Sequence, residues 1–270
     1  MCGIVGITSS KEVTSRIIGS LKKLEYRGYD SAGIATISEN NINEVKCEGR
    51  VNELEKNVNQ INLSGTIGIG HVRWATHGKP STINAHPHSS DNVSVVHNGI
   101  IENSTILKKI LEKKGYKFKS QTDTEVIVHL VTDYLKKNNL KDTIIKVLKK
   151  LHGSFALGII LKDQPDLIIG ARRGSPLAVG YGPDEHYLGS DSYALKSMTN
   201  KISYLNDGEF CILKKDQVEF FDSDGIKTNK EVLNLSKDEQ NYEKGQYKYF
   251  MAKEIDCLLY TSPSPRDSMT

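Results

Sequence analysis

The second residue of the chain is a cysteine, and its position could give its thiol a base within the same residue. The sequence begins Met1-Cys2-Gly3, and a small residue at position two permits removal of the initiator methionine. A thiol attacks as its thiolate, with an ordinary pKa of about 8.5, and a free α-amine of pKa about 7.7–8.0 can accept its proton. Cys2 is therefore a candidate nucleophile. The alternative is that a small residue occupies position two for no catalytic reason.

Two later segments hold polar groups that hydrolysis of an amide would need. Residues 71–81 read HVRWATHGKPS and residues 97–103 read HNGIIEN, each after an apolar run that predicts a strand. Strand ends hold side chains rigidly. Arg73 offers a planar fork for a substrate carboxylate. Asn98 can donate a side-chain N–H and Gly99 a backbone N–H toward one point, which is the arrangement of an oxyanion hole.

The other histidines and cysteines are interpreted as structural. The His-Pro-His run at residues 86–88 lacks the helical spacing and carboxylate partners of common zinc motifs, so no metal site is predicted. His129 falls in a helical pattern. The four cysteines form no Cys-x-x-Cys pair, so neither a zinc site nor a disulfide framework is indicated. Cys47 and Cys211 lie in or beside strand-like segments and are expected to be buried, inert thiols.

Composition limits the class of protein without choosing an activity. The 270 residues permit one large domain or two ordinary ones, and 37% of them are hydrophobic and 26% charged. A formal net charge of +3 and scattered lysines predict no nucleic-acid partner. No stretch approaches the ~18 apolar residues of a membrane span, and no leader is recognisable. We therefore expect a cytosolic protein without a membrane partner.

Hydrophobic periodicity predicts the elements that must position these residues. A period of two indicates strands and a period of three to four indicates helices. Because many strands follow one another directly, the predicted class is α+β with largely antiparallel sheets. Thr122, three residues before Glu125, predicts a capping box for the third helix. The predicted strands are residues 4–7, 33–37, 66–71, 93–97, 155–161, 167–171, 177–180, 202–205 and 210–214, and the predicted helices are residues 12–26, 104–114, 123–137 and 141–151.

Five sequence runs together resemble a known family: CGIVG at residues 2–6, LEYRGYDSAG at 24–33, RWATHG at 73–78, NAHPH at 84–88 and HNGIIEN at 97–103. In this order and spacing they resemble the class II glutamine amidotransferases, which belong to the N-terminal nucleophile hydrolase superfamily. The second and third runs are most similar to the glucosamine-6-phosphate synthases, also called glutamine:fructose-6-phosphate aminotransferases (isomerizing). Taken alone, residues 24–33 could equally be an ordinary helix-to-strand turn.

The resemblance implies a role for each matching residue. Cys2 would attack the side-chain amide of glutamine to form a thioester and release ammonia, and Asn98 and Gly99 would hold the oxyanion. Arg73 would bind the α-carboxylate of glutamine and Asp123 its α-ammonium. No cofactor is implied. The remaining implied positions are Thr76 and His77, which would line the glutamine pocket, and Trp74, which would gate the passage of ammonia from a mobile loop of residues 73–81.

The resemblance also implies the architecture. It predicts a four-layer αββα sandwich for residues 2–238, a linker at 239–255 leading toward a sugar-isomerase half, and a tail at 256–270 outside the likeness. The tail's run DCLLYTSPSPRDSMT predicts a truncated or joined reading frame, the alternative being a natural short form. Fructose 6-phosphate would bind only through that second half, and the complete enzyme would be a homodimer.

Two other functions stay open at this point. An inactive glutaminase-like domain could serve as a binding module, and an amidotransferase of the same class could feed another acceptor. The presence of every polar group that the chemistry needs argues against the first. The second depends on the half that would choose the acceptor.

Overall fold

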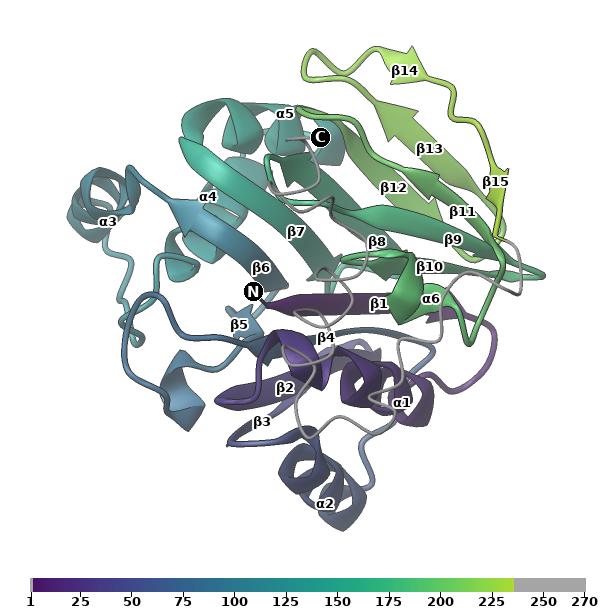
Figure 1. Cartoon of the computed structure of the whole chain (residues 1–270). Helices are drawn as coiled ribbons and strands as arrows, with labels where there is room; N and C mark the ends of the chain where they lie inside the picture. Colours follow the sequence, from purple (N-terminus) through teal and green to yellow (C-terminus); the bar gives the residue numbers. More distant parts are fainter. Residues whose placement is uncertain (1, 236–270) are drawn as a thin grey trace, which may run out of the picture. The chain divides into compact units, whose positions relative to one another are not determined.

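The computed structural model describes residues 2–235. The predicted linker at 239–255 and tail at 256–270 lie outside the described residues. The elements up to Asn234 belong to one compact unit. They form two antiparallel sheets with helices on the two outer faces (Figure 1).

The first sheet places the N-terminal strand near its middle. Its eight strands run in the order β15-β11-β9-β10-β1-β4-β2-β3. Because β1 pairs with β10 on one side and β4 on the other, Cys2 directly precedes an interior strand. The bounds are β15 (Leu233–Asn234), β11 (Lys201–Tyr204), β9 (Ala178–Gly182), β10 (Glu185–Gly189), β1 (Gly3–Ser9), β4 (Ile67–Arg73), β2 (Ser31–Ser38) and β3 (Asn41–Glu48).

The second sheet carries the Asn98-Gly99 pair within a strand. Its seven strands run in the order β14-β13-β12-β8-β7-β6-β5. The strand predicted at residues 93–97 continues to Ile101, so Asn98 and Gly99 are part of β6 and pair with β7. The bounds are β14 (Lys227–Thr228), β13 (Val218–Phe221), β12 (Phe210–Lys214), β8 (Gln164–Arg173), β7 (Gly153–Leu161), β6 (Val93–Ile101) and β5 (His88–Ser89).

Helices cover the outer face of each sheet and complete four layers. α1 and α2 lie against the first sheet, and α4 and α5 lie against the second (Figure 1). The predicted αββα arrangement is therefore confirmed. The helices are α1 (Thr14–Leu24), η1 (Glu25–Arg27), α2 (Val51–Ile61), η2 (Thr82–Asn84), α3 (Ser104–Lys113), α4 (Glu125–Leu135), α5 (Leu140–Lys150) and α6 (Ser192–Leu195).

The period-two alternation of the strands separates two cores. In β7, Phe155 and Leu157 pack in the core shared with α4 and α5, whereas Ala156 and Ile160 pack between the sheets. Successive side chains of a strand point to opposite faces, and facing sheets pack about 10 Å apart. Because β7 is buried on both faces, its sequence is a continuous apolar run, and this run made its position predictable.

The predicted capping box is wrong. α4 begins at Glu125, its N-cap residue is Thr124, and no side chain caps it. The hydroxyl of Thr122 lies 3.0 Å from Ser120 Oγ and 3.0 Å from His88 Nε2 instead. The Glu125 carboxylate accepts the N–H of Ser120 at 2.7 Å. Tertiary partners thus replace the local cap.

Some elements were missed by the periodicity reading. β3 is an edge strand in which Cys47 is the one buried residue, so it lacks an alternating apolar signal. β10 carries one charged residue and His186 among its five residues, and its assignment depends on pairing with β1. α2 has buried Val51, Leu54 and Val58 at helical spacing, a pattern that could have been read from the sequence.

Candidate active site

Every second residue of a strand points to the same face, and this alternation places the predicted catalytic residues together between the sheets. In β4, Ile67 and Ile69 pack in the inter-sheet core, so His71 and Arg73, which share their parity, fall on the same face. In β6, Val96 packs in that core, and Asn98 shares its parity. The two strands therefore present His71 and Asn98 to each other across the gap, and the two side chains are hydrogen-bonded at 3.0 Å.

Cys2 lies against the main chain where β4 ends. The Trp74 N–H donates to Cys2 Sγ at 3.2 Å, and the sulfur lies 3.5 Å from the Trp74 carbonyl oxygen. Burial raises the pKa of the Cys2 thiol, although the Trp74 N–H and the Arg73 charge oppose that shift. A thiol with a raised pKa is largely protonated at neutral pH, so it needs a base in order to attack.

Asn98 joins the cysteine to the second sheet. Its Nδ2 donates to the Cys2 carbonyl oxygen at 3.1 Å and to Ser190 Oγ at 2.9 Å. Gly99 follows with φ +125°, and a Cβ there would lie 2.1 Å from the Ser154 carbonyl oxygen. Only glycine adopts this conformation freely, so the backbone beside Asn98 depends on Gly99.

Arg73 anchors the loop that follows β4. Its Nη2 donates to the carbonyl oxygens of His77 and Gly78, the latter at 3.1 Å, while its buried Nη1 has no partner in the described structure. Burial lowers the pKa of the guanidinium, and the nearby carboxylates of Asp30 and Asp123 oppose that shift. Arg73 therefore holds the loop with one nitrogen, and its other nitrogen is buried without a hydrogen-bond partner among the described residues.

Asp123 is held at the C-terminal end of β6, and that end lies two residues beyond Gly99. Its Oδ2 accepts the Ile101 N–H at 2.7 Å, and 8% of the residue is exposed. The neighbouring Thr124 hydroxyl lies 2.8 Å from His86 Nε2 and 3.0 Å from His97 Nδ1. These contacts fix the segment before α4, so the carboxylate is positioned by the strand and by buried imidazoles together.

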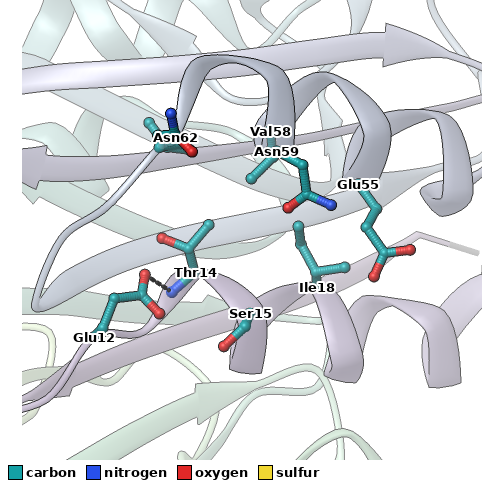
Figure 2. A pocket seen from close by; sticks show the side chains of 9 residues that line it. Glu12, Thr14, Ser15, Ile18, Glu55, Val58, Asn59 and Asn62 are labelled. Atoms are coloured by element: carbon teal, nitrogen blue, oxygen red, sulfur yellow. Dashed lines mark hydrogen bonds between the residues drawn. The ribbon is translucent and has the colours of Figure 1, made fainter.

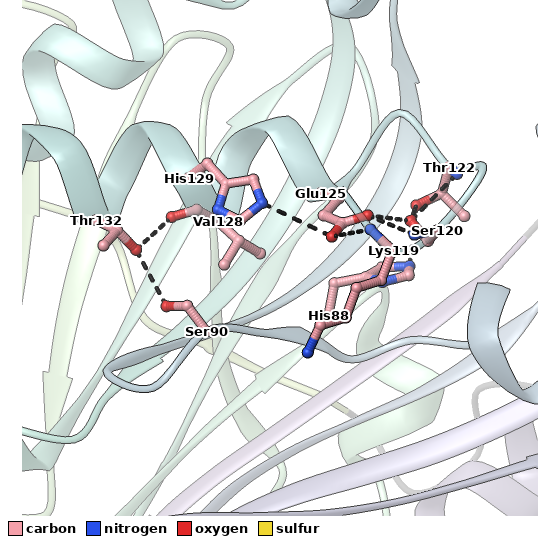
Figure 3. Close-up of polar contacts among 9 residues, drawn as sticks. All are labelled: His88, Ser90, Lys119, Ser120, Thr122, Glu125, Val128, His129 and Thr132. Atoms are coloured by element: carbon pink, nitrogen blue, oxygen red, sulfur yellow. Dashed lines mark hydrogen bonds and ion pairs between the residues drawn. The ribbon is translucent and has the colours of Figure 1, made fainter. Parts of the chain in front are cut away.

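A second set of contacts braces the same segment (Figure 3). The Glu125 carboxylate accepts the N–H groups of Lys119 and Ser120 at 2.8 and 2.7 Å, and His129 Nε2 lies 3.7 Å away. Burial raises the pKa of the Glu125 carboxyl, but the His129 ring and the N–H donors outweigh it and lower the pKa to about 2. Glu125 is therefore ionised and holds the turn that carries Asp123.

The buried imidazoles are kept neutral. His71 and His86 lie with ring centroids 4.3 Å apart, and burial lowers the pKa of both, that of His71 to about 3. Burial likewise lowers the pKa of His88 to about 3. Within residues 2–235, no group of three or more His, Cys, Asp or Glu side chains is arranged to hold a metal ion. These histidines act as hydrogen-bonding groups between the layers.

Known proteins share these sequence runs and this fold. A family model described as a glutamine amidotransferase domain matches residues 73–197. The chain is 49% identical over 273 residues to the glutamine--fructose-6-phosphate aminotransferase (isomerizing) of Clostridium acetobutylicum, covering 100% of this chain and 44% of that protein. It is also 49% identical over 256 residues to that of Bradyrhizobium diazoefficiens, covering 94% and 42%. The chain belongs to the glutamine amidotransferase family. This amidotransferase chain spans less than half the length of the curated relatives that it matches.

Solved structures place the amidotransferase in a fold class. The glutamine phosphoribosylpyrophosphate amidotransferase of B. subtilis superposes with a TM-score of 0.70 at 29% identity, over 82% of this chain and 49% of that one. A glutamine aminotransferase class-II domain protein from Silicibacter pomeroyi gives a TM-score of 0.59 at 12% identity over 82% of this chain and 99% of that one, which is a likeness of fold. The fold is that of the N-terminal nucleophile hydrolases.

The other predicted glutamine-site residues of the amidotransferase lie on the loop that follows β4 and are exposed. Thr76 and His77 are exposed, and they lie 3.4 Å apart, Thr76 Oγ1 to His77 Nδ1. Trp74 is 47% exposed and meets the Tyr29 ring edge-on, with centroids 5.6 Å apart. Among these three side chains, the structure shows no contact with Asp123 or Asn98 in the described residues. The structure therefore does not bring these three side chains together with Asp123 and Asn98.

Sequence reasoning assigned no role to two residues that join the site. Asp30 Oδ2 accepts the Ala75 N–H at 2.6 Å and so holds the loop from the first sheet. Its place in the run LEYRGYDSAG was a signal that could have been followed. Ser190 is fully buried, accepts the Ile4 N–H at 2.7 Å and contacts Asn98. It stands outside every motif run, so only the pairing of β1 with β10 reveals it.

A separate hollow lies elsewhere on the amidotransferase. It measures about 300 Å³ and lies between α1 and α2, where Glu12 and Glu55 are among its lining residues (Figure 2). Glu12 Oε1 accepts the Thr14 N–H at 2.6 Å. The predicted site residues do not line this hollow. No helix within residues 2–235 is long and apolar enough to cross a membrane.

Proposed function

We propose that the chain hydrolyses the side-chain amide of glutamine through a thioester on Cys2. The observation that carries this proposal is the position of Asn98. Its amide nitrogen lies 3.1 Å from the carbonyl oxygen of Cys2, so an oxyanion donor adjoins the nucleophilic residue. Family membership supports the same chemistry. Because burial raises the pKa of the Cys2 thiol, attack needs a base, and in this proposal the α-amine of Cys2 is that base.

The proposed reaction balances within Cys2, glutamine and water. After Met1 is removed, the α-amine takes the thiol proton and the sulfur attacks the amide carbon. The Asn98 Nδ2–H, which donates to the Cys2 carbonyl in the structure, then donates to the new oxyanion instead. The Gly99 N–H donates a second hydrogen bond to the same oxyanion. The carbon–nitrogen bond breaks, and ammonia leaves with the proton from the ammonium group. Water hydrolyses the thioester to glutamate and restores the free thiol.

Substrate recognition in this proposal uses two opposite charges. The unpartnered Nη1 of Arg73 would bind the α-carboxylate of glutamine, and Asp123 would bind its α-ammonium. Thr76 and His77 would line the pocket from the loop at 73–81. Closure of that loop would exclude water from the thioester, and Trp74 would gate the passage of ammonia. Reading both charges selects a free amino acid over a glutamine side chain in a protein.

The names of the curated relatives support a proposal for the activity of the complete protein. Two of them are named glutamine--fructose-6-phosphate aminotransferases, and the chain covers 44% and 42% of their lengths. We propose that residues 2–238 form the glutaminase domain and that the ammonia serves synthesis of glucosamine 6-phosphate in a homodimeric enzyme. Fructose 6-phosphate would bind in a second half, reached through the linker at 239–255. The buried free thiols of Cys47 and Cys211 suit a reducing cytosol.

The decisive test is glutamine turnover by the purified 270-residue chain, with removal of Met1 verified by mass spectrometry. We expect equal amounts of glutamate and ammonia, and no change of products when fructose 6-phosphate is added. Cys2→Ala, and any uncleaved extension before Cys2, should abolish turnover. Cys47→Ala is the matched control, because it removes a buried thiol away from the site and should retain activity.

Other outcomes would favour the rival functions. A folded, fully processed chain without turnover would support the inactive binding module. Full turnover by a chain with an uncleaved extension would overturn the role of the α-amine. Another amino acceptor that accelerated ammonia consumption by the complete protein would favour a different product.

A further inference from the structure

We propose that His71 is a positioning residue that determines which end of the Asn98 amide faces Cys2. This inference rests on the proposed glutaminase function, because it concerns the donor that would stabilise the oxyanion. Asn98 could present either its oxygen or its nitrogen to the nucleophile. Only the nitrogen donates a hydrogen bond, so the orientation of the amide decides whether an oxyanion hole exists.

The main chain determines which nitrogen of His71 carries the hydrogen. His71 Nε2 lies 3.0 Å from the carbonyl oxygen of His97 and 3.0 Å from Asn98 Oδ1. A carbonyl oxygen can only accept, so Nε2 must donate. A donating Nε2 in turn requires an acceptor at Asn98, which places Oδ1 toward His71 and Nδ2 toward Cys2.

The contacts at the other end of the amide impose the same orientation. Asn98 Nδ2 lies 3.1 Å from the Cys2 carbonyl oxygen and 2.9 Å from Ser190 Oγ. Ser190 Oγ also accepts the Ile4 N–H at 2.7 Å. A rotated amide would set Oδ1 against the Cys2 carbonyl and the NH₂ group against the N–H of His71. The Cys2 carbonyl and the His71 N–H would then both lose their hydrogen bonds to Asn98 in a buried site, which is costly.

Burial keeps His71 in this form. The ring is fully buried and packs against His86, and its Nδ1 has no partner within the described structure. A neutral imidazole has one N–H, and here the carbonyl of His97 holds it on Nε2. His71 thus offers Asn98 one donor in one direction.

The orientation can be tested with two amide substitutions at His71 in the full chain. The amide nitrogen of a glutamine can reach the place of the Nε2 donor, whereas that of an asparagine reaches only the place of Nδ1. We expect His71→Gln to keep kcat for glutamine within about threefold and His71→Asn to lower it by about 10- to 100-fold, part of the loss from removing a whole oxyanion donor. KM should change little in both, since Arg73 and Asp123 are untouched.

A double-mutant comparison separates positioning from general support of the fold. If His71 acts through Asn98, adding His71→Asn to Asn98→Ala should cause no further loss of kcat. His186→Ala is the matched control, because His186 is also buried and pairs with a main-chain carbonyl, that of Lys214 at 2.6 Å. It faces Thr8, at the far end of β1 from Cys2. The inference would be overturned if the double variant lost kcat by the product of the two single-variant factors. It would also be overturned if His71→Gln and His71→Asn had equal kcat.

A readout independent of activity keeps this inference distinct from the proposed function. The side-chain ¹⁵N–H signals of Asn98 should exchange slowly in the wild type and in His71→Gln, and faster in His71→Asn. Slow exchange in all three would overturn the positioning role even if every protein were active. A wild-type chain that does not hydrolyse glutamine would refute the proposed function, and the NMR comparison would still decide the orientation.

Discussion

Replacing Arg73 should weaken glutamine binding by an amount that can be worked out from its contacts. One guanidinium nitrogen already donates to the carbonyls of His77 and Gly78, and the other is buried without a partner. A substrate carboxylate would therefore gain a charge-assisted hydrogen bond, which contributes about 1.5–3 kcal/mol. Since each 1.4 kcal/mol is tenfold, Arg73→Met should raise KM for glutamine by about 10- to 150-fold.

Arg73→Lys should be nearly as harmful. A lysine ammonium is a single point charge and cannot hold the loop carbonyls and a substrate carboxylate as two separate nitrogens do. In both variants kcat at saturating glutamine should fall much less than kcat/KM, because the carboxylate is remote from the reacting amide. A loss confined to KM marks uniform binding of ground state and transition state.

The assay compares glutamine with glutaminamide, in which an amide replaces the α-carboxylate. Wild type should prefer glutamine by about the same 10- to 150-fold factor, and Arg73→Met should lose that preference. Arg173→Met is the control, because Arg173 also donates to main-chain carbonyls, those of Leu151 at 2.6 Å and Leu148 at 3.1 Å. A variant of Arg73 that still prefers glutamine by the wild-type factor would refute the assignment.

Four further predictions follow from single contacts. Asn98→Ala should lower kcat by about 100- to 1000-fold with KM nearly unchanged; a loss in KM alone would contradict the oxyanion role. Gly99→Ala should lower the free energy of unfolding in urea by more than the ~1–3 kcal/mol of backbone strain, because its Cβ would meet Ser154, whereas Gly115→Ala, with φ +90° and nothing within 4 Å, should show strain alone. Because burial raises the pKa of the Cys2 thiol, kcat/KM should rise from pH 6 to 8 as an α-amine of pKa about 7.7–8.0 loses its proton; a flat profile would exclude that amine as the base. The Glu125 pKa of about 2 lies below its unfolded value, so its stabilisation is present above pH 4.5 and is lost as the pH falls toward 2; thermal melts of Glu125→Gln should show a lower Tm at pH 7 and a smaller fall across that range.

Much of the fold was predictable because burial leaves a periodic record in the sequence. The apolar run at residues 155–161 and the helical pattern at 141–151 both correspond to observed elements, β7 and α5. The edge strand β3 was not predictable in this way, since one solvent-exposed face and no second sheet neighbour leave it mostly polar. The start of α4 was misjudged because Thr122 takes tertiary hydrogen bonds in place of the local cap.

By itself, the sequence determined which residues could do chemistry. A cysteine at position two, an arginine after a strand and an Asn-Gly pair can be identified from residue type, order and spacing, because those properties are local. The four layers followed from a resemblance carried by five such runs.

Only the tertiary structure decided how these residues are held. Ser190 reaches Ile4 across 186 positions and Asn98 across 92, and the register of β1 with β10 makes both contacts possible. His71 meets Asn98 because two strands in different sheets present the same parity to one gap. Hydrogen bonds depend on distance and direction in space, and a linear pattern records neither for residues this far apart.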